Sequence, residues 1–349
     1  MAPAASAKHF IARHPRYSTL LALVLVGLLF VYAQGPPDPP YFNKHNPLKT
    51  WISEEDRRYQ QTLREREGMV RKWGPTPDRV QAFPPQDDFY TLWDFYIPSF
   101  RCPHRVERVG ALGDGGKWVC GLERIAQQDS CVIYSFGINN ESSFEAALLR
   151  AAPRCQVWGY DFSVPNFGPE ITEDYSLRSR SHFKSWGLGS ADNYGPDANP
   201  PFYTLQTLMA MNGHSFIDIL KVDIEGAEFD ALASFLTHHI AQAAKRPPPP
   251  PPPSNPHAPP PPPSPMLPLL PIGQLQIELH ARSGSGHDTF AAFNSWWESL
   301  EAAGLRPFFA EPNLVYVNLV RGVRPDLVEY SLLNIRGDHA LVSDRYIAF

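Results

Sequence analysis

Apolar segments that predict strands alternate with segments that predict helices from about residue 131 onward, and this alternation constrains the fold most. The strand segments are 131–137, 155–161, 216–223 and 274–280. Helical patterns follow at 141–151, 226–239 and 290–303. Strands that alternate with helices form parallel, doubly wound sheets, in which ligands bind beyond the carboxyl ends of the strands. The sequence therefore predicts an α/β fold whose ligand site is formed by the residues that follow each strand.

The end of the chain contains two more apolar runs, 306–311 and 314–320. Pro312 and Asn313 separate them, and short apolar runs on either side of turn residues predict a hairpin. We therefore expect these two runs to be strands that close the sheet.

An uncharged apolar run of about 17 residues, 18–34, indicates a transmembrane helix of minimum length. Lys8, Arg13 and Arg16 precede the run, and basic residues favour the cytosolic side of a membrane. We expect an uncleaved signal-anchor, which makes the chain a single-pass type II membrane protein of the endoplasmic reticulum or Golgi with a lumenal folded domain. A signal peptide cleaved near Ala33 is the alternative, although the apolar region of such peptides is usually ~7 to 15 residues.

Proline accounts for 38 of the 349 residues, and most of it clusters in stretches that cannot belong to a packed sheet. The amino-terminal stretch predicts an extended linker over 35–50, followed by a helix over 53–73 with a solvated, charged face. The later stretch predicts an exposed polyproline insertion. The expected regions are the cytosolic tail 1–17, the anchor 18–34, the linker and stem 35–98, and the folded domain 99–349 with the insertion 246–271.

The charge of the chain argues against a nucleic-acid partner. The formal net charge is −5, and the first 34 residues carry three basic groups and no acid, so the rest of the chain is more acidic still. A nucleic-acid partner requires a basic face that releases counterions from the phosphates. We therefore expect no nucleic-acid partner, and contact with the membrane only through the single amino-terminal helix.

Four cysteines, Cys102, Cys120, Cys131 and Cys155, all follow the apolar run. An oxidising lumen permits disulfides among them in three complete pairings. We expect a bridge between Cys102 and Cys120, while Cys131 and Cys155 are either bridged or buried as free thiols at the starts of strands. No pair has the CxxC spacing of metal or thioredoxin sites.

The segment YSFGINNESSFE, 134–145, joins a predicted strand to a predicted helix through Gly137. Glycine lets the backbone approach a ligand closely, and the free amides at the start of a helix face that ligand. Asn139 and Glu141 lie in the same turn. Asp161 ends the next strand, where doubly wound nucleotide folds bind the ribose hydroxyls. We expect these four residues to contact a nucleotide-like cofactor.

The segment IDILKVDIEGAE, 217–228, delivers Asp223 and Glu225 to a strand end, and the next predicted strand delivers Glu278 and His280 to the same edge. Three carboxylates and an imidazole at one edge are costly unless they bind a cation, share protons or do chemistry. His280 is the first choice for a general base, because its unperturbed pKa near ~6.5 suits neutral pH. Asp223, or a cation held by the three carboxylates, is the alternative.

The segment GDGGKWVC, 113–120, has two interpretations. Its glycines supply the positive φ angles of a tight hairpin turn before a short strand. Because the segment lies just before the first core strand, it equally fits a cover over the ligand site, with Asp114 and Lys117 as contacts.

Together these residues carry a family resemblance. The segment LKVDIEGAE is similar to the signature of FkbM-type methyltransferases. With GDGGKWVC, YSFGINNESSFE and LQIELH it resembles a family of membrane-anchored methyltransferase-domain proteins over residues 99–320, apart from the proline insertion. The resemblance implies a Rossmann-like class I methyltransferase fold, with a mostly parallel seven-strand sheet and an antiparallel last strand. Phe136, Ile138 and Asn139 depart from the usual acid and glycine pattern of the first motif.

The resemblance also implies S-adenosyl-L-methionine as cofactor and a small-molecule or glycan acceptor as partner. The methyl group would go to a hydroxyl or carboxyl group of a glycan, lipid or protein. The expected cofactor-binding residues are Gly137, Asn139, Glu141, Asp161 and Asp223, and the expected catalytic residues are His280, Asp223 and Glu225, with no metal. Two other classes stay open. One is a catalytically silent methyltransferase fold that serves as a binding or scaffold protein. The other is a type II glycosyltransferase that uses Asp223 and Glu225 as a metal-binding acid pair.

Overall fold

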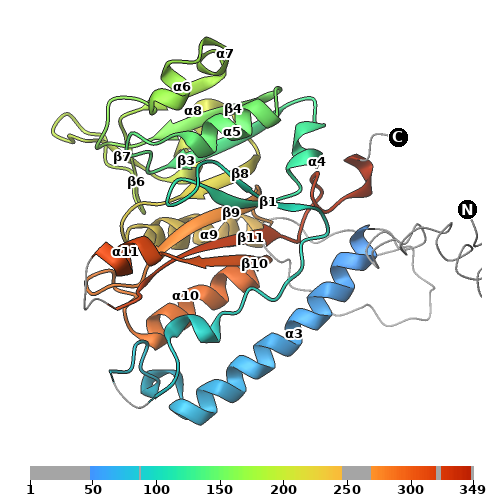
Figure 1. Cartoon of the computed structure of the whole chain (residues 1–349), viewed down its shortest axis with the longest axis vertical. Coiled ribbons are helices and arrows are strands. Elements are labelled where there is room, and N and C mark those ends of the chain that lie inside the picture. Colours follow the sequence, from blue (N-terminus) through green and yellow to red (C-terminus); the bar gives the residue numbers. More distant parts are fainter. Residues whose placement is uncertain (1–47, 86–87, 246–268, 320–323, 347–349) are drawn as a thin grey trace, which may run out of the picture. The chain divides into compact units, whose positions relative to one another are not determined.

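The predicted strands are present in the computed structural model, which describes residues 48–85, 88–245, 269–319 and 324–346. They are β3 (Cys131–Phe136), β4 (Cys155–Tyr160), β8 (Ile217–Val222) and β9 (Ile272–His280). With β5 (Ser181–Lys184), β10 (Leu305–Pro312) and β11 (Leu327–Asn334) they form one sheet in the order β10-β11-β9-β8-β3-β4-β5 (Figure 1). The mostly parallel seven-strand sheet is therefore confirmed.

The strand directions fit the expected class. Strands β9, β8, β3, β4 and β5 run parallel to one another, whereas β11 is antiparallel to both β9 and β10. The chain moves outward from β3 through β4 to β5 and then returns to the other side of β3 as β8. The strand order thus reverses between β3 and β8, which is where a doubly wound sheet binds its ligand.

Helices cover both faces of the sheet, and β3 shows why. Tyr134 and Phe136 pack in the core shared with α8, α9 and α10, whereas Ile133 packs in the core shared with α4 and α5. A strand that is apolar on both faces needs such a cover on each side. The helices are α4 (Leu122–Ala126), α5 (Ser143–Ala151), α6 (Pro169–Thr172), α7 (Tyr175–Arg178), α8 (Leu205–Asn212), α9 (Glu228–Lys245) and α10 (Phe290–Ala302).

Two small sheets accompany the large one. The segment GDGGKWVC lies in an antiparallel hairpin of β1 (Val106–Val109) and β2 (Lys117–Cys120), so the hairpin interpretation is confirmed. Strands β6 (Gly187–Leu188) and β7 (Phe202–Tyr203) form the other sheet. Short 3-10 helices span Pro77–Arg79, Leu92–Phe95 and Asp344–Tyr346.

Helix α3 (Leu48–Trp73), the long blue helix of Figure 1, differs from the expected stem. It starts within the predicted linker 35–50, of which 35–47 lie outside the described residues. Tyr59 and Arg66 of α3 are buried, and both donate hydrogen bonds to the carboxylate of Glu301 on α10. The expected solvated, charged face is present, because most charged residues of α3 are exposed, but the opposite face is buried and α3 belongs to the compact unit Leu48–Phe349.

The expected closing hairpin is also wrong. Residues 306–311 do form β10, but the next run forms helix α11 (Leu314–Leu319), and the last strand is β11. The side-chain oxygen of Asn313 accepts a hydrogen bond from the backbone N–H of Tyr316, which caps the first turn of a helix. A short apolar run does not by itself distinguish strand from helix.

Both cysteine pairs are disulfides. Cys102 is bonded to Cys120, as predicted, and Cys131 is bonded to Cys155. The second pair joins directly opposed positions of the parallel strands β3 and β4, with a Cα–Cα distance of 4.4 Å. The alternative of buried free thiols is therefore excluded.

The tail 1–17 and the apolar run 18–34 lie outside the described residues. Within the described ranges, no helix combines the length and apolar character needed to cross a membrane. Residues 246–268 of the insertion also lie outside them. Its end belongs to the core, because Leu270 is buried and its carbonyl accepts a hydrogen bond from Asn334. Strand β9 begins at Ile272, directly after the expected insertion boundary at residue 271.

Candidate functional site

A cavity of about 350 Å³ lies where the strand order of the sheet reverses. Its wall includes Gly137 after β3, Asp161 after β4, Asp223 after β8 and Glu278 near the end of β9. The carboxyl ends of parallel strands meet at one edge, so the sequence predicts this meeting correctly. The cavity therefore occupies the predicted place.

Gly137 forms the turn between β3 and α5. Its φ angle is +77°, and a Cβ at this position would overlap the carbonyl oxygen of Asp223. Asn139 and Asn140 continue the turn with φ angles of 43° and 60°. Only glycine accommodates both the positive φ and the close approach of β8, so residue 137 fixes the path of the turn along the cavity.

Asp161 holds this turn from the end of β4. Its Oδ2 accepts hydrogen bonds from the backbone N–H groups of Ile138 and Asn139, both at 2.8 Å. Its Oδ1 accepts from the backbone N–H and the hydroxyl of Ser163. Burial raises the pKa of Asp161, but these hydrogen bonds together hold it below the ordinary value. The carboxylate is thus ionised, and it shapes the cavity as well as lining it.

The remaining wall has an apolar part and a polar part. Phe162, Trp186, Leu188 and Phe202 form the apolar part, from the ends of β4 and β5 and from the small β6-β7 sheet. Glu141 belongs to the polar part, and its carboxylate accepts from the backbone N–H of Ser143 and lies against Gly115 of the hairpin tip. The tip residues Asp114, Gly115 and Lys117 line the cavity, so the hairpin also borders the site.

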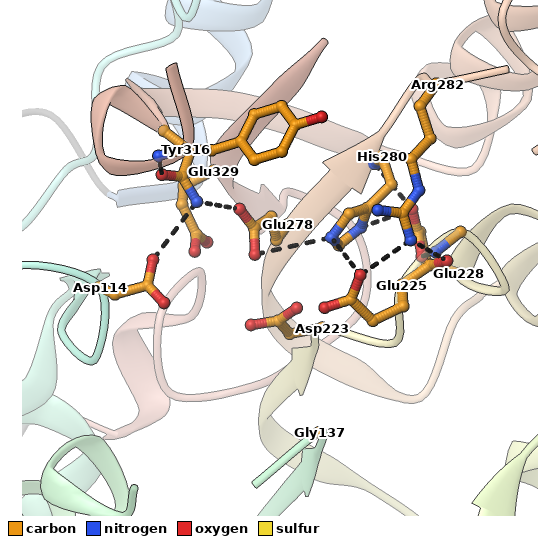
Figure 2. Close-up of polar contacts among 12 residues, drawn as sticks. Asp114, Gly137, Asp223, Glu225, Glu228, Glu278, His280, Arg282, Tyr316 and Glu329 are labelled. Carbon is orange, nitrogen blue, oxygen red and sulfur yellow. Dashed lines mark hydrogen bonds and ion pairs between the residues drawn. The ribbon is translucent and has the colours of Figure 1, made fainter. Parts of the chain in front are cut away.

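Three carboxylates meet at the ends of β8, β9 and β11 (Figure 2). One oxygen from each of Asp223, Glu278 and Glu329 lies within 4.8 Å of the others. The ammonium group of Lys117, on β2, contacts Glu329 and lies 3.9 Å from Asp223. Lys117 therefore compensates part of the negative charge of this cluster, and its neighbours raise its pKa in spite of burial.

The carboxyl groups of Asp223 and Glu278 differ in protonation. Burial raises the pKa of Glu278 to about 8, and the charges of Asp223 and Glu329 act in the same direction. Burial also raises the pKa of Asp223, but Lys221 and Lys117 outweigh it and lower the pKa below the ordinary value. Two neighbouring carboxyl groups have pKa values that differ in this way because the charge on one disfavours ionisation of the other. Asp223 is the permanent anion, and Glu278 is the group that gains and loses a proton near neutral pH.

His280 does not suit the role of general base. Its side chain is 1% exposed, and its Nδ1 lies 3.2 Å from Oε1 of Glu228, on α9. Burial lowers the pKa of His280, but the hydrogen bond and charge of Glu228, together with the charges of Glu278 and Asp223, raise it to about 9. A histidine that is protonated at neutral pH has no free lone pair for a substrate proton. The protonation of His280 could not be predicted from the sequence, because its partner Glu228 lies 52 residues away.

Glu225 reaches the cavity but is already paired. Its φ angle is 59°, and its side chain is 72% exposed. Its carboxylate accepts a hydrogen bond of 2.8 Å from Arg282 and lies 3.6 Å from Nε2 of His280. Lys117, Arg282 and the protonated His280 supply positive charge to this group of acids, so we assign no metal to it.

The raised pKa values of Glu278 and His280 predict the pH dependence of stability. Between its ordinary value of 4.5 and about 8, folded Glu278 keeps a proton that the unfolded chain has lost. The bound proton makes its full contribution to the free energy of unfolding below pH 4.5, and this contribution is lost as the pH rises to about 8. His280 contributes in the same way between pH 6.5 and about pH 9. Two buried histidines, His104 and His339, act in the opposite direction up to about pH 6.5, because burial lowers their pKa values from 6.5 to about 4. The free energy of unfolding should therefore fall from about pH 6.5 to about pH 8, as measured by urea denaturation.

Glu278→Gln should reduce this fall by up to about 1.4 kcal/mol per pH unit, because glutamine keeps the shape of the protonated side chain and does not titrate. Glu298→Gln is the control. Glu298 also accepts a hydrogen bond from an asparagine amide, that of Asn294 at 2.8 Å, but lies outside the cavity wall. An unchanged slope in Glu278→Gln would show that Glu278 holds no proton in this range.

Residues 51–246, more than half of the chain, match the model of a family described as "Methyltransferase domain". None of the curated proteins compared with the chain matches it.

Several solved structures are similar. The fibrillarin pre-rRNA processing protein of Methanococcus jannaschii is 14% identical, with 60% of this chain and 68% of that chain covered and a TM-score of 0.32. An O-methyltransferase family protein of Burkholderia thailandensis is 10% identical, with 62% and 56% covered and a TM-score of 0.29. The mitomycin 7-O-methyltransferase is 12% identical, with 61% and 53% covered and a TM-score of 0.26. The family match and the strand order carry the assignment: this chain belongs to the methyltransferase-domain family and is an S-adenosylmethionine-dependent methyltransferase.

Proposed function

We propose that the cavity binds S-adenosylmethionine and that Glu278 takes the proton from a hydroxyl acceptor. The wall fits the cofactor, because its aromatic part suits an adenine ring. Five acidic residues besides Glu278, and only two lysines, Lys117 and Lys221, line the cavity, which suits a cationic sulfonium. Both lysines are engaged, with Glu329 and with the carbonyl of Gly137.

The predicted cofactor residues would share this task. Gly137 and Asn139 present the turn, Asp161 fixes it and faces the ribose, and Glu141 and Asp223 complete the polar wall. The apolar part of the wall, which includes Phe162, would contact the adenine ring. The resemblance to FkbM-type enzymes, which rests on LKVDIEGAE, stays a prediction and is consistent with Asp223 at this position.

The position of Glu278 in the cavity wall carries the proposal for the chemistry. The bound donor supplies a methyl group on a sulfonium sulfur to an acceptor oxygen. Glu278, 5% exposed and facing the anionic Asp223, accepts the hydroxyl proton on its carboxylate. A base whose pKa is close to the working pH is best matched to this task. Glu278 therefore replaces His280 in the role of base, and the protonated His280 balances charge behind it.

The cofactor part of the proposal predicts the effect of Asp161→Ala. Loss of the carboxylate should weaken binding of S-adenosylmethionine by about 1.5 to 3 kcal/mol, the range for hydrogen bonds to a charged group, as measured by isothermal calorimetry. The control is Asp174→Ala, since Asp174 also accepts from a backbone N–H and a serine hydroxyl, those of Ser176, but at an exposed helix start. An Asp161→Ala protein that is folded and binds with unchanged affinity would remove Asp161 from the site.

We also propose that the domain acts in the lumen of the endoplasmic reticulum or Golgi, on a glycan, lipid or protein acceptor, and is held by a signal-anchor at 18–34. The basic residues before that run support this orientation. The disulfides Cys102–Cys120 and Cys131–Cys155 support it as well, because disulfides persist in oxidising compartments.

The proposed topology predicts the outcome of a protease-protection experiment. In sealed microsomes, a carboxyl-terminal tag should survive added protease and be digested once detergent opens the membrane. A tag placed before Lys8 is the control and should be digested without detergent. Digestion of the carboxyl-terminal tag in sealed microsomes would place the domain in the cytosol.

A further inference from the structure

The side chain of Asn313 touches three separate elements at the edge of the cavity. Its Nδ2 donates hydrogen bonds to Oε1 of Glu278 at 2.7 Å and to Oδ1 of Asp114 at 3.3 Å. Its Oδ1 accepts from the backbone N–H of Tyr316 at 2.9 Å. Asp114, Glu278 and Tyr316 lie together in Figure 2. Asn313 thus connects the hairpin tip, the end of β9 and the start of α11.

The chemistry of an amide fits these contacts. An amide carries two N–H donors and one oxygen acceptor, which matches two carboxylates and one backbone N–H. The backbone N–H of Asn313 is also engaged, with the carbonyl of Leu327 at the start of β11, at 3.2 Å. Aspartate or serine at this position would still cap α11, because their oxygens accept from a backbone N–H, but neither has the amide donors.

We propose that Asn313 is a positioning residue for methyl transfer, which fixes the carboxyl group of Glu278 at the cavity and ties the hairpin tip and α11 to it. This inference rests on the proposed role of Glu278 as base. Asn313 does not itself line the cavity, so it acts through Glu278.

A neutral amide donor also influences the titration of its partner. Its hydrogen bond lowers the pKa of Glu278, against the effect of burial and of the neighbouring acids. The charged groups that surround Glu278 are Asp223 from β8, His280 from β9, Lys117 from β2, Glu329 from β11 and Asp114 from the hairpin tip. Asn313→Ser removes only this donor, whereas Asn313→Asp also adds a charge, so a shift in titration that both variants share reports on the Asn313 contact.

Asn313→Asp and Asn313→Ser in the full-length protein test the inference, since both keep the cap of α11. Both should raise the pKa of Glu278 by about one unit, because a hydrogen bond to a charged group is worth that much or more. This pKa is measured without any acceptor, as the difference in the pH dependence of unfolding between each variant and the same variant with Glu278→Gln. The rate with tritiated S-adenosylmethionine and solubilised microsomes as acceptor source should fall about tenfold at pH 7 and recover at higher pH.

Asn294→Ala is the matched control, because Asn294 donates to Glu298 at 2.8 Å and accepts from Tyr96 at 3.0 Å in a different part of the fold. It should leave the pH profile unchanged. A shift in Asn313→Asp without one in Asn313→Ser would assign the effect to the added charge and overturn the inference, as would no shift in either. An active Glu278→Gln enzyme would instead refute the proposed base, whatever the pKa of Glu278 does in the Asn313 variants.

Discussion

Glu278→Gln should lower the rate of methyl transfer at least about 100-fold, since a positioned general base typically contributes 10² to 10⁴. Glutamine has the same shape and can still accept the hydrogen bond that Asn313 donates to Glu278, but it cannot take up a proton. The affinity for S-adenosylmethionine should stay unchanged, because the loss concerns the acceptor proton. Transfer of tritiated methyl groups to solubilised microsomes measures the rate, and isothermal calorimetry measures the affinity.

Glu298→Gln is the control and should keep the wild-type rate. The outcome also distinguishes the two kinds of acceptor. A carboxyl acceptor is ionised at neutral pH and needs no base, because the pKa of carboxyl groups lies near ~4. A Glu278→Gln enzyme that retains its rate would therefore rule out Glu278 as base and favour a carboxyl group over a hydroxyl.

Gly137→Ala should abolish cofactor binding and lower the free energy of unfolding by about 3 kcal/mol, the sum of a strained φ angle and an overpacked contact. The added Cβ would overlap the carbonyl oxygen of Asp223, so either β3 or β8 must move. Both strands carry cavity residues at their ends, and the site changes shape whichever moves. Urea denaturation and calorimetry with S-adenosylmethionine measure the two effects.

The control variant Gly213→Ala separates the cost of the strained φ angle from the cost of the overpacked contact. Gly213 has a φ angle of +72°, close to that of Gly137, but a Cβ there would have no heavy atom within 4 Å. This control should cost only about 1 kcal/mol, the penalty for a left-handed residue, and should leave cofactor binding intact. Equal costs in the two variants would show that the backbone of β8 does not confine residue 137.

The cavity could be located from the sequence because its residues follow strands. Gly137, Asp161, Asp223 and Glu278 come directly after, or near the end of, apolar runs, and parallel strands bring such positions to one edge whatever the details of packing. The antiparallel position of β11 followed from the family resemblance and is confirmed. The periodicity of the last apolar run could not supply it, since that run forms α11 and β11 lies beyond it.

What the sequence could not supply depends on contacts between distant residues. Glu228 raises the pKa of His280, and for that reason we propose Glu278 as the base instead. Asn313 looked like a turn residue, because its partners Glu278 and Asp114 lie 35 and 199 residues away. Long-range pairs of this kind leave no local pattern.

The buried face of helix α3 could not be predicted for a related reason. Its sequence is rich in charge, which predicts a solvated face. Arg66 is nevertheless 6% exposed, because Glu301 lies opposite it, 235 residues along the chain. A buried charge is tolerated when it is paired and hydrogen-bonded, and only the folded structure shows the pair.

The pairing of Arg66 with Glu301 also decides which fragments of this enzyme could be released intact by proteolysis. A protease that cuts just before Leu48 frees the whole compact unit Leu48–Phe349 with the pair in place. A cut after Trp73 that lets α3 depart leaves the Glu301 carboxylate buried without its cation, at a cost of about 3 to 5 kcal/mol. Any stable proteolytic fragment of the enzyme should therefore retain all of α3 at its new amino terminus.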